Sequence, residues 1–145
     1  MKLNKVKIQL INEKSRTYEK EKICNTTDVV KLINKYEKLD KNAEETTILI
    51  CLNTKNDVLC YSEIAKGGIN FCNIDIKTIY KTILLCNASK FILVHNHPSG
   101  DVTPSTADIL ITEHLKDCSK LLKIDFLDHV IISNNGFTSC FNIEK

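Results

Sequence analysis

A chain of 145 residues, 43% hydrophobic and 26% charged, has the size and composition of one globular domain. No apolar run approaches the roughly 20 residues that span a bilayer, and the N-terminus lacks the apolar run of a signal peptide, so we expect a cytoplasmic protein with no membrane partner. The net charge is only +2 and Arg16 is the only arginine, which argues against sequence-specific reading of DNA. Lysines can still hold phosphates, so a nucleic-acid partner stays an open, weakly supported alternative.

The N-terminal part of the chain predicts a strand hairpin followed by a helix. Polar and apolar side chains alternate over 5–13 and 18–24, as in strands with one buried face. Apolar positions over 29–39 then follow a helical stripe, and Thr27 or Asp28 can cap that helix.

The next part of the chain predicts two strands, a helix, a strand and a helix. Residues 46–53 and 57–65 flank a short polar turn, which is typical of a hairpin. Helical spacing returns over 74–89. The wholly apolar run 91–95 predicts a strand at the centre of a sheet, and the helical pattern resumes over 104–122.

Two further strands, 126–133 and 136–143, surround a turn at residues 134–136. Strands and helices are therefore interleaved along the chain. We expect one α/β domain with a mixed β-sheet flanked by helices.

The chain contains seven cysteines, which raises the question of a disulfide framework or a zinc cluster. Their number is odd, no CxxC pair occurs, and most lie inside apolar stretches. Free, buried thiols in a reducing compartment fit these observations better than disulfides do.

Two histidines, His95 and His97, end the central apolar strand. Alternate side chains of a strand share one face, so both imidazoles point the same way. A catalytic zinc needs a third protein ligand as well, and Asp108 is the candidate. Gly100 and Pro104 would let the loop reverse and bring the next helix back over the strand end.

A structural interpretation of the same residues is equally consistent with the spacing. Ser105-x-x-Asp108 resembles a helix-capping box, with Asp in place of Glu. Pro104 suits the first helical position better, with Thr103 as the cap. In that case Asp108 lies in the second turn and has no capping role.

The stretch HNHPSGDVTPSTAD resembles the JAMM metalloprotease signature, in which H-x-H is followed by ten residues and Asp, with Ser three positions earlier. The longer string is similar to the RadC branch of the JAB/MPN superfamily, as are NAS, LDHVIIS and LNTKND elsewhere in the chain. The resemblance implies the JAB/MPN fold, which is cytidine-deaminase-like. It implies a metal-binding core over 45–141 behind an N-terminal hairpin and helix over 1–44.

The resemblance also implies roles for individual residues. His95, His97 and Asp108 become ligands of a zinc ion whose fourth ligand is water. Ser105 becomes the residue that polarises the scissile carbonyl or stabilises the oxyanion.

A glutamate that acts as general base must come from an upstream segment. Similar sequences place it before a strand that ends in Leu-Asp, and Glu45 stands at the matching distance, with Asn53 in place of the Asp. Glu44 and Glu63 are the alternatives, and a solvent-exposed glutamate without catalytic function is the other interpretation.

Two segments depart from the family pattern. Both lie outside the metal signature, so they put substrate or partner contacts in doubt and do not affect the expected zinc binding. Residues 76–78 replace a Pro-Arg-Glu, and residues 65–68 replace a Ser-x-Gly-Thr. The family's helix-hairpin-helix region, its main nucleic-acid element, is not expected within these 145 residues.

Other polar residues near these segments have simpler interpretations. His129 and Asp128 are expected to be hydrogen-bonded structural residues, with a position behind the metal ligands as the alternative for His129. His114 is expected on the surface. Ser99 and Asp101 either shape the cleft or are ordinary loop residues.

The sequence therefore predicts a zinc-dependent hydrolase of JAMM type that cleaves a peptide or isopeptide bond in a peptide or protein substrate. The alternative is a metal-binding module without turnover, associated with DNA repair or maintenance.

Overall fold

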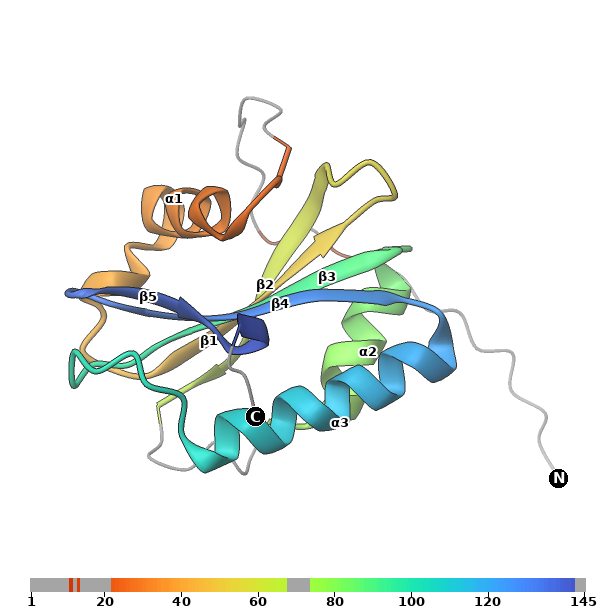
Figure 1. The fold of residues 1–145 in the computed structure, drawn as a ribbon. Coiled ribbons are helices and arrows are strands. Elements are labelled where there is room, and N and C mark those ends of the chain that lie inside the picture. Colours follow the sequence, from red (N-terminus) through yellow and green to blue (C-terminus); the bar gives the residue numbers. More distant parts are fainter. Residues whose placement is uncertain (1–10, 12, 14–21, 68–73, 143–145) are drawn as a thin grey trace, which may run out of the picture.

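A computed structural model describes residues 11, 13, 22–67 and 74–142 of the chain (Figure 1). The strand hairpin expected over 5–13 and 18–24 falls almost entirely outside these residues. None of the described helices is long and apolar enough to cross a membrane.

Five strands form one mixed sheet in the order β2-β1-β3-β4-β5. They are β1 (Thr46–Leu52), β2 (Val58–Lys66), β3 (Lys90–Asn96), β4 (Asp125–Ser133) and β5 (Gly136–Ser139). β1 pairs antiparallel with both β2 and β3, β3 pairs parallel with β4, and β4 pairs antiparallel with β5. The apolar run that predicts a central strand is the middle strand of the sheet.

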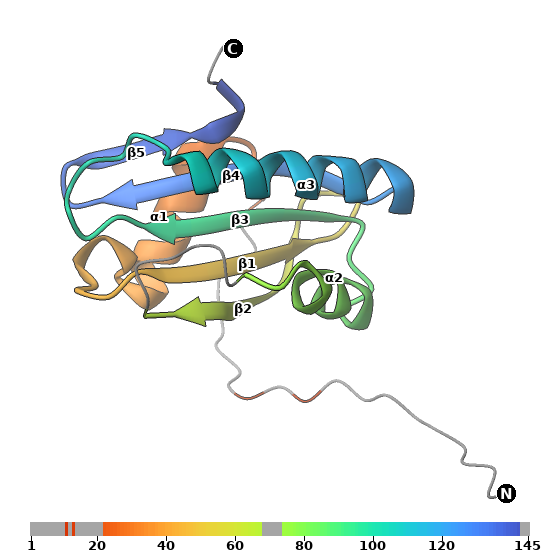
Figure 2. The same ribbon diagram turned by 90° about the horizontal axis from the view of Figure 1, so that it is seen from below.

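Helices cover both faces of this sheet. They are α1 (Thr26–Glu37), α2 (Ile76–Leu85) and α3 (Thr106–Leu122), with short 3₁₀ turns at η1 (Leu39–Lys41) and η3 (Cys140–Asn142). α1 lies on one face, and α2 and α3 lie on the other (Figures 1 and 2). The mixed α/β architecture expected from the sequence is confirmed.

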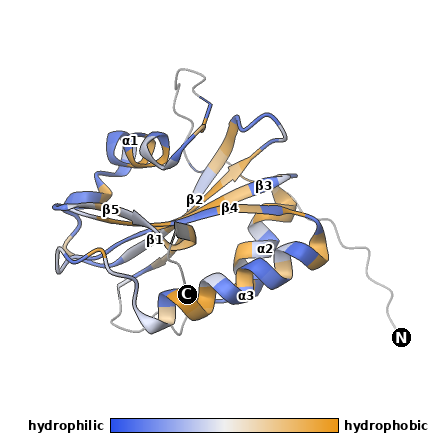
Figure 3. Ribbon diagram, in the orientation of Figure 1, coloured by the Kyte–Doolittle hydropathy of each residue, from blue (hydrophilic) through white to orange (hydrophobic). Residues whose placement is uncertain are grey.

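Two apolar cores fill the two faces because β1, β3 and β4 are buried on both sides (Figure 3). In β1, Ile48 and Ile50 face the core under α1, whereas Leu49 and Cys51 face the core under α2 and α3. The same alternation puts Phe91, Leu93 and then His95 of β3 on the α2 and α3 side. The histidines therefore point towards α3.

The helix caps differ from the expected ones. α1 is capped by Asn25, whose side chain accepts from the backbone N–H of Asp28, and neither Thr27 nor Asp28 is the cap. At α3 the cap is Ser105, not Thr103. Asp108 completes a capping box there, so the capping-box interpretation of the spacing is confirmed. The alternative, in which Thr103 is the cap and Asp108 has no capping role, is wrong.

Six cysteines lie in the described part of the chain, and all six are free thiols. Cys51 and Cys140 are buried, while Cys24 is exposed. The expectation that the cysteines are buried therefore does not hold for every one of them. Cys24 is exposed because it precedes α1 and does not lie inside an apolar strand.

Candidate metal centre

The candidate centre lies where β3 ends and α3 begins. β3 provides His95, the loop after it provides His97, and the first turn of α3 provides Asp108. All three come together because α3 returns across the sheet face towards which the histidines point (Figure 2).

The donor atoms are spaced as ligands of one small cation would be. His95 Nε2 lies 3.0 Å from His97 Nε2 and 3.2 Å from Asp108 Oδ1, and His97 Nε2 lies 3.5 Å from Asp108 Oδ2. Two ligands of a tetrahedral zinc with bonds of 2.0–2.1 Å are separated by about 3.3 Å. The side chains of His95 and Asp108 are wholly buried, and that of His97 is 15% exposed, so the group opens on the His97 side.

The two carboxylate oxygens of Asp108 have different surroundings. Oδ2 accepts from the backbone N–H and the hydroxyl of Ser105, at 2.7 Å each. Oδ1 is buried and has no hydrogen-bond partner among the described residues. A buried carboxylate oxygen without a donor is costly, and a cation at this point would satisfy it.

The proton on His97 is placed by a backbone carbonyl. Its Nδ1 lies 2.7 Å from the carbonyl oxygen of Asp101, which only accepts, so Nδ1 carries the hydrogen. In the neutral ring Nε2 then presents a lone pair to the centre.

The proton on His95 is placed by a longer chain of hydrogen bonds. The hydroxyl of Thr112 donates to the backbone carbonyl of Asp108 at 2.6 Å. Its oxygen therefore accepts from His129 Nδ1 at 2.6 Å, and His129 Nε2 accepts from His95 Nδ1 at 2.9 Å. His95 Nε2 is left without a hydrogen and faces Asp108 Oδ1, another acceptor. Two acceptors at 3.2 Å repel each other unless a cation or a proton lies between them.

The electrostatic environment shifts the pKa values of the two histidines in opposite directions. Burial lowers the pKa of His95 below its usual value, with Asp108 opposing it, and burial lowers the pKa of His129 to about 3. Burial alone would raise the pKa of Asp108, but contacts with His95, His97 and Ser105 outweigh it and hold that pKa well below its usual range. Contact with Asp108 raises the pKa of His97, against the effect of burial. The centre therefore combines an ionised carboxylate with two imidazoles, from which a divalent cation would displace any proton.

Glu45 lies next to the centre, immediately before β1. Its side chain forms a group with His95 and His97 in which the donor atoms lie within 4.8 Å of one another. Its Oε1 is buried and has no hydrogen-bond partner in the part of the chain that the structure describes. Burial raises the pKa of Glu45, with His97 opposing and Asp108 reinforcing the effect.

The two alternative glutamates lie elsewhere. Glu44 points to the surface, where its carboxylate is 3.9 Å from the Lys66 ammonium. Glu63 is exposed on the edge strand β2. Glu45 alone of the three shares the candidate centre, although its role as a base stays a prediction.

Comparison with known proteins gives the family. Residues 6–144 match the RadC-like JAB domain. The chain belongs to the RadC-like JAB domain family. It is 44% identical over 118 residues to a UPF0758 protein of Clostridium perfringens, covering 81% of this chain and 51% of that protein. It is 38% identical over 120 residues to a UPF0758 protein of Methanosarcina barkeri, covering 83% and 52%. The chain thus spans about half the length of these curated relatives.

In this RadC-like JAB domain, the Ser105 hydroxyl is hydrogen-bonded to Asp108, whereas the resemblance implied that it faces the substrate. The hydroxyl donates to Asp108 Oδ2 and accepts from the Asp108 backbone N–H. The single hydroxyl hydrogen is therefore used within the capping box, and a role on an oxyanion would require it to turn away from Asp108. That role stays a prediction.

Asn96 was not anticipated as a site residue, yet it fixes the backbone on both sides of Glu45. Its buried side chain accepts from the Thr46 N–H at 2.8 Å and donates to the Glu44 carbonyl at 3.2 Å. The Glu45 carbonyl in turn accepts from the Gly67 N–H. The sequence contained a signal for this role. Asn96 lies between the two histidines and faces the opposite side of the strand, so its amide needs hydrogen-bond partners inside the core.

The other polar residues near the centre have clear positions. His129 contacts His95 from behind, which is the alternative position predicted for it, although the role of His95 as a ligand stays a prediction. Asp128 is structural and accepts from Thr26 and Ser139. His114 is exposed, as expected. Asp101 takes part through its backbone carbonyl, and the Ser99 hydroxyl accepts from the Asp101 N–H.

Proposed function

We propose that this chain is a zinc-dependent hydrolase of JAMM type that cleaves a peptide or isopeptide bond in a peptide or protein substrate. The observation that carries the proposal is the convergence of the Nε2 atoms of His95 and His97 and an unpartnered Asp108 oxygen, with the unpartnered oxygen of Glu45 beside them. Membership of the RadC-like JAB domain family is consistent with zinc-dependent hydrolysis.

The residues divide the work as follows. His95, His97 and Asp108 would hold the ion. Zinc, when bound, supplies a Lewis acid that polarises a carbonyl and lowers the pKa of a water molecule towards 7. Glu45, whose raised pKa suits a group that accepts and returns a proton, takes the proton of the attacking water and passes it to the leaving amine.

The fixed positions of these groups matter as much as their identity. His95 is held by His129, His97 by the Asp101 carbonyl, and the backbone of Glu45 by Asn96. The two imidazoles and the backbone of Glu45 are therefore held in place before substrate binds, which is how preorganised sites lower an activation barrier.

Metal analysis tests the first half of the proposal. The purified chain is expected to retain about one zinc per molecule, and His95→Gln or Asp108→Asn to retain none. Exposed His114→Gln is the matched control and should leave the zinc content unchanged. Absence of stoichiometric zinc from the unaltered chain contradicts the proposal.

Glu45→Gln tests the second half. The amide keeps the size of the side chain but cannot take a proton, so zinc content should be unchanged while hydrolysis of a peptide or isopeptide library falls at least about 100-fold. Glu44→Gln and Glu63→Gln are controls of the same chemistry at exposed positions. Zinc binding without turnover in the unaltered chain would instead favour the non-catalytic module, and salt-dependent DNA binding would support its association with DNA maintenance.

A further inference from the structure

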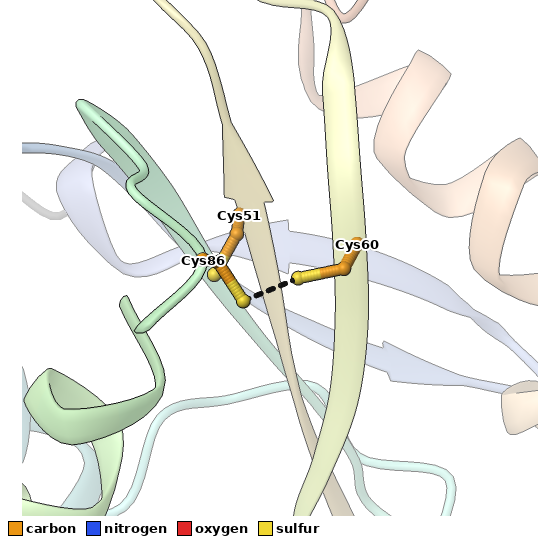
Figure 4. Close-up of side chains that lie close together, drawn as sticks. All are labelled: Cys51, Cys60 and Cys86. Carbon is orange, nitrogen blue, oxygen red and sulfur yellow. Dashed lines mark hydrogen bonds between the residues drawn. The ribbon is translucent and has the colours of Figure 1, made fainter. Parts of the chain in front are cut away.

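Three cysteine side chains meet at the opposite end of the sheet face that carries the centre. Cys51 of β1 and Cys60 of β2 are cross-strand partners, and Cys86 is the C-terminal cap of α2. Their sulfur atoms lie within 4.8 Å of one another. The Cys60 and Cys86 sulfurs are only 2.9 Å apart (Figure 4).

This thiol cluster, Cys51, Cys60 and Cys86, is separate from the metal centre. Thr47 of β1 pairs with His95, whereas Cys51 pairs with Phe91 near the other end of the two strands. Four residues along a strand correspond to about 13 Å. The cluster therefore has no part in the chemistry proposed above.

The three thiols differ in reactivity. Hydrogen bonding from Cys51 lowers the pKa of Cys60 to about 6, against the opposing effect of burial. Burial raises the pKa of Cys86 to about 11, and the Cys60 contact adds to the effect. Cys60 and Cys86 are partly exposed, while Cys51 is buried. Cys60 is therefore the thiol of the three that ionises most readily, and the buried Cys51 serves as its hydrogen-bond donor.

A bound metal explains this geometry less well than oxidation does. Structural zinc takes four protein ligands and holds two sulfurs about 3.8 Å apart, whereas the described residues supply three sulfurs, one pair of them at 2.9 Å. Three thiolates around a monovalent soft cation would leave two net negative charges against the apolar core that includes Ile79 and Ile83. A disulfide is neutral and avoids that desolvation cost.

We propose that Cys60 and Cys86 are a site of reversible oxidation, at which a hydroperoxide converts the two thiols into a disulfide. The Cys60 thiolate attacks one peroxide oxygen, the O–O bond breaks, and Cys60 becomes a sulfenic acid while hydroxide leaves. Cys86 gives its proton to that hydroxide and attacks the Cys60 sulfur. The S–O bond breaks as the S–S bond forms and joins β2 to the end of α2. The second hydroxide leaves and is neutralised by the proton that Cys60 released to solvent when it ionised. Two electrons pass from the thiols to the peroxide, and a dithiol reverses the reaction by exchange.

The position of the pair suits a reaction with a dissolved oxidant. β2 is an edge strand of the sheet, and Cys86 ends its helix, so neither sulfur is enclosed between the sheet and a helix as Cys51 is. The oxidised link would fix the end of α2, and with it the start of β3, against the edge of the sheet.

Intact mass and peptide mapping of the full chain test the proposal. Stoichiometric hydrogen peroxide should remove two hydrogen atoms from the chain, and the two cysteines of the disulfide should then resist alkylation. Dithiothreitol should restore the reduced chain. Cleavage after lysine puts Cys60 in peptide 56–66 and Cys86 in peptide 82–90, each with no other cysteine. The linked pair of these peptides is the expected product.

Variants separate the pair from the cluster and from a metal site. Cys60→Ser should abolish the link, and exposed Cys24→Ser should leave it intact. Cys51→Ala should still link the same two peptides, but more slowly, because Cys60 loses the hydrogen bond that lowers its pKa. Cys86→Ser should leave Cys60 as a sulfenic acid that dimedone traps. The proposal is overturned if hydrogen peroxide oxidises Cys60 to no greater extent than it oxidises Cys24. It is also overturned if the reduced chain retains a metal that Cys60→Ser or Cys51→Ala loses and His95→Gln keeps.

Discussion

His95 is oriented by a chain of three hydrogen bonds that ends on the backbone of α3, the helix that carries Asp108. The chain runs from His95 to His129, to Thr112 and to the Asp108 carbonyl. Each hydrogen has one allowed place because the last acceptor is a carbonyl. A single hydroxyl that contacts neither His95 nor the Asp108 carboxylate therefore decides which nitrogen of His95 carries the hydrogen.

Thr112→Val removes this hydroxyl and keeps the shape of the side chain. His129 then loses its acceptor, the tautomer of His95 is no longer fixed, and zinc affinity should fall about 10–100-fold. Competition with a chromogenic chelator measures that affinity. Thr82→Val is a matched control, since Thr82 also donates to the carbonyl four residues earlier in a helix but has no metal centre beside it. Equal zinc affinity in the two variants would show that the hydroxyl does not orient His95.

Asp108 shows what a sequence pattern can and cannot assign. Strand periodicity was sufficient to predict that His95 and His97 face the same way, and the spacing singled out Asp108. The same spacing left capping and metal binding as alternatives. The structure shows one carboxylate oxygen in the capping box and the other facing His95, because a pattern identifies a residue and does not distinguish between its atoms.

At the scale of elements, the loop between β3 and α3 sets the position of His97. Its Gly100 has φ +87, and an added Cβ would lie 2.7 Å from Asn135 Nδ2. The Gly100 carbonyl accepts from Ser133 and Asn135, which lie at the β4–β5 turn. The loop is therefore fixed to a turn that is distant in sequence, and Asp101 and its contact with His97 follow from that docking.

Gly100→Ala should disturb this docking beyond the ordinary cost of a left-handed backbone. A non-glycine residue at such φ costs about 1–2 kcal/mol, and the contact with Asn135 adds to it, so zinc affinity should fall together with the free energy of unfolding. Gly67→Ala is the matched control, with φ +70 and no atom within 4 Å of the added Cβ. It should show the backbone cost alone. Denaturant unfolding and zinc competition measure both quantities, and equal losses in the two variants would contradict the docking.

Elements of this fold were more predictable than their ends and their pairing. Periodicity found the described strands and helices, but the caps at Asn25 and Ser105 were decided by side-chain geometry that propensity alone does not resolve. The antiparallel pairing of Thr47 with His95, which brings Glu45 to the centre, depends on sheet register between segments far apart in sequence. Spacing along the chain carries no information about that register, so only the resemblance to a family could point to Glu45.

At the scale of the whole molecule, the candidate centre exists only in the folded chain. Glu45 precedes β1, the histidines follow β3, Asp108 begins α3, and His129 lies in β4. The unfolded chain holds these residues apart, so an ion that binds the folded state adds its binding free energy to stability. Two apolar cores can form without the ion, whereas the facing acceptors of His95 and Asp108 are relieved only when a cation or a proton lies between them.

Zinc should therefore raise the melting temperature of the chain. At a free concentration 100 times the dissociation constant, the gain is about 2.7 kcal/mol, which corresponds to roughly 8–10 °C for a domain of this size. Calorimetry in zinc and in excess chelator measures the shift. His95→Gln should melt at the same temperature in both, because it lacks a ligand, while Glu45→Gln should keep the full shift, because it lacks only the base. Cys60→Ser should keep it too, since the thiol cluster lies at the other end of β1. Equal melting of the unaltered chain in zinc and in chelator, or a shift that disappears with Cys60→Ser, would place the ion elsewhere than at the two histidines.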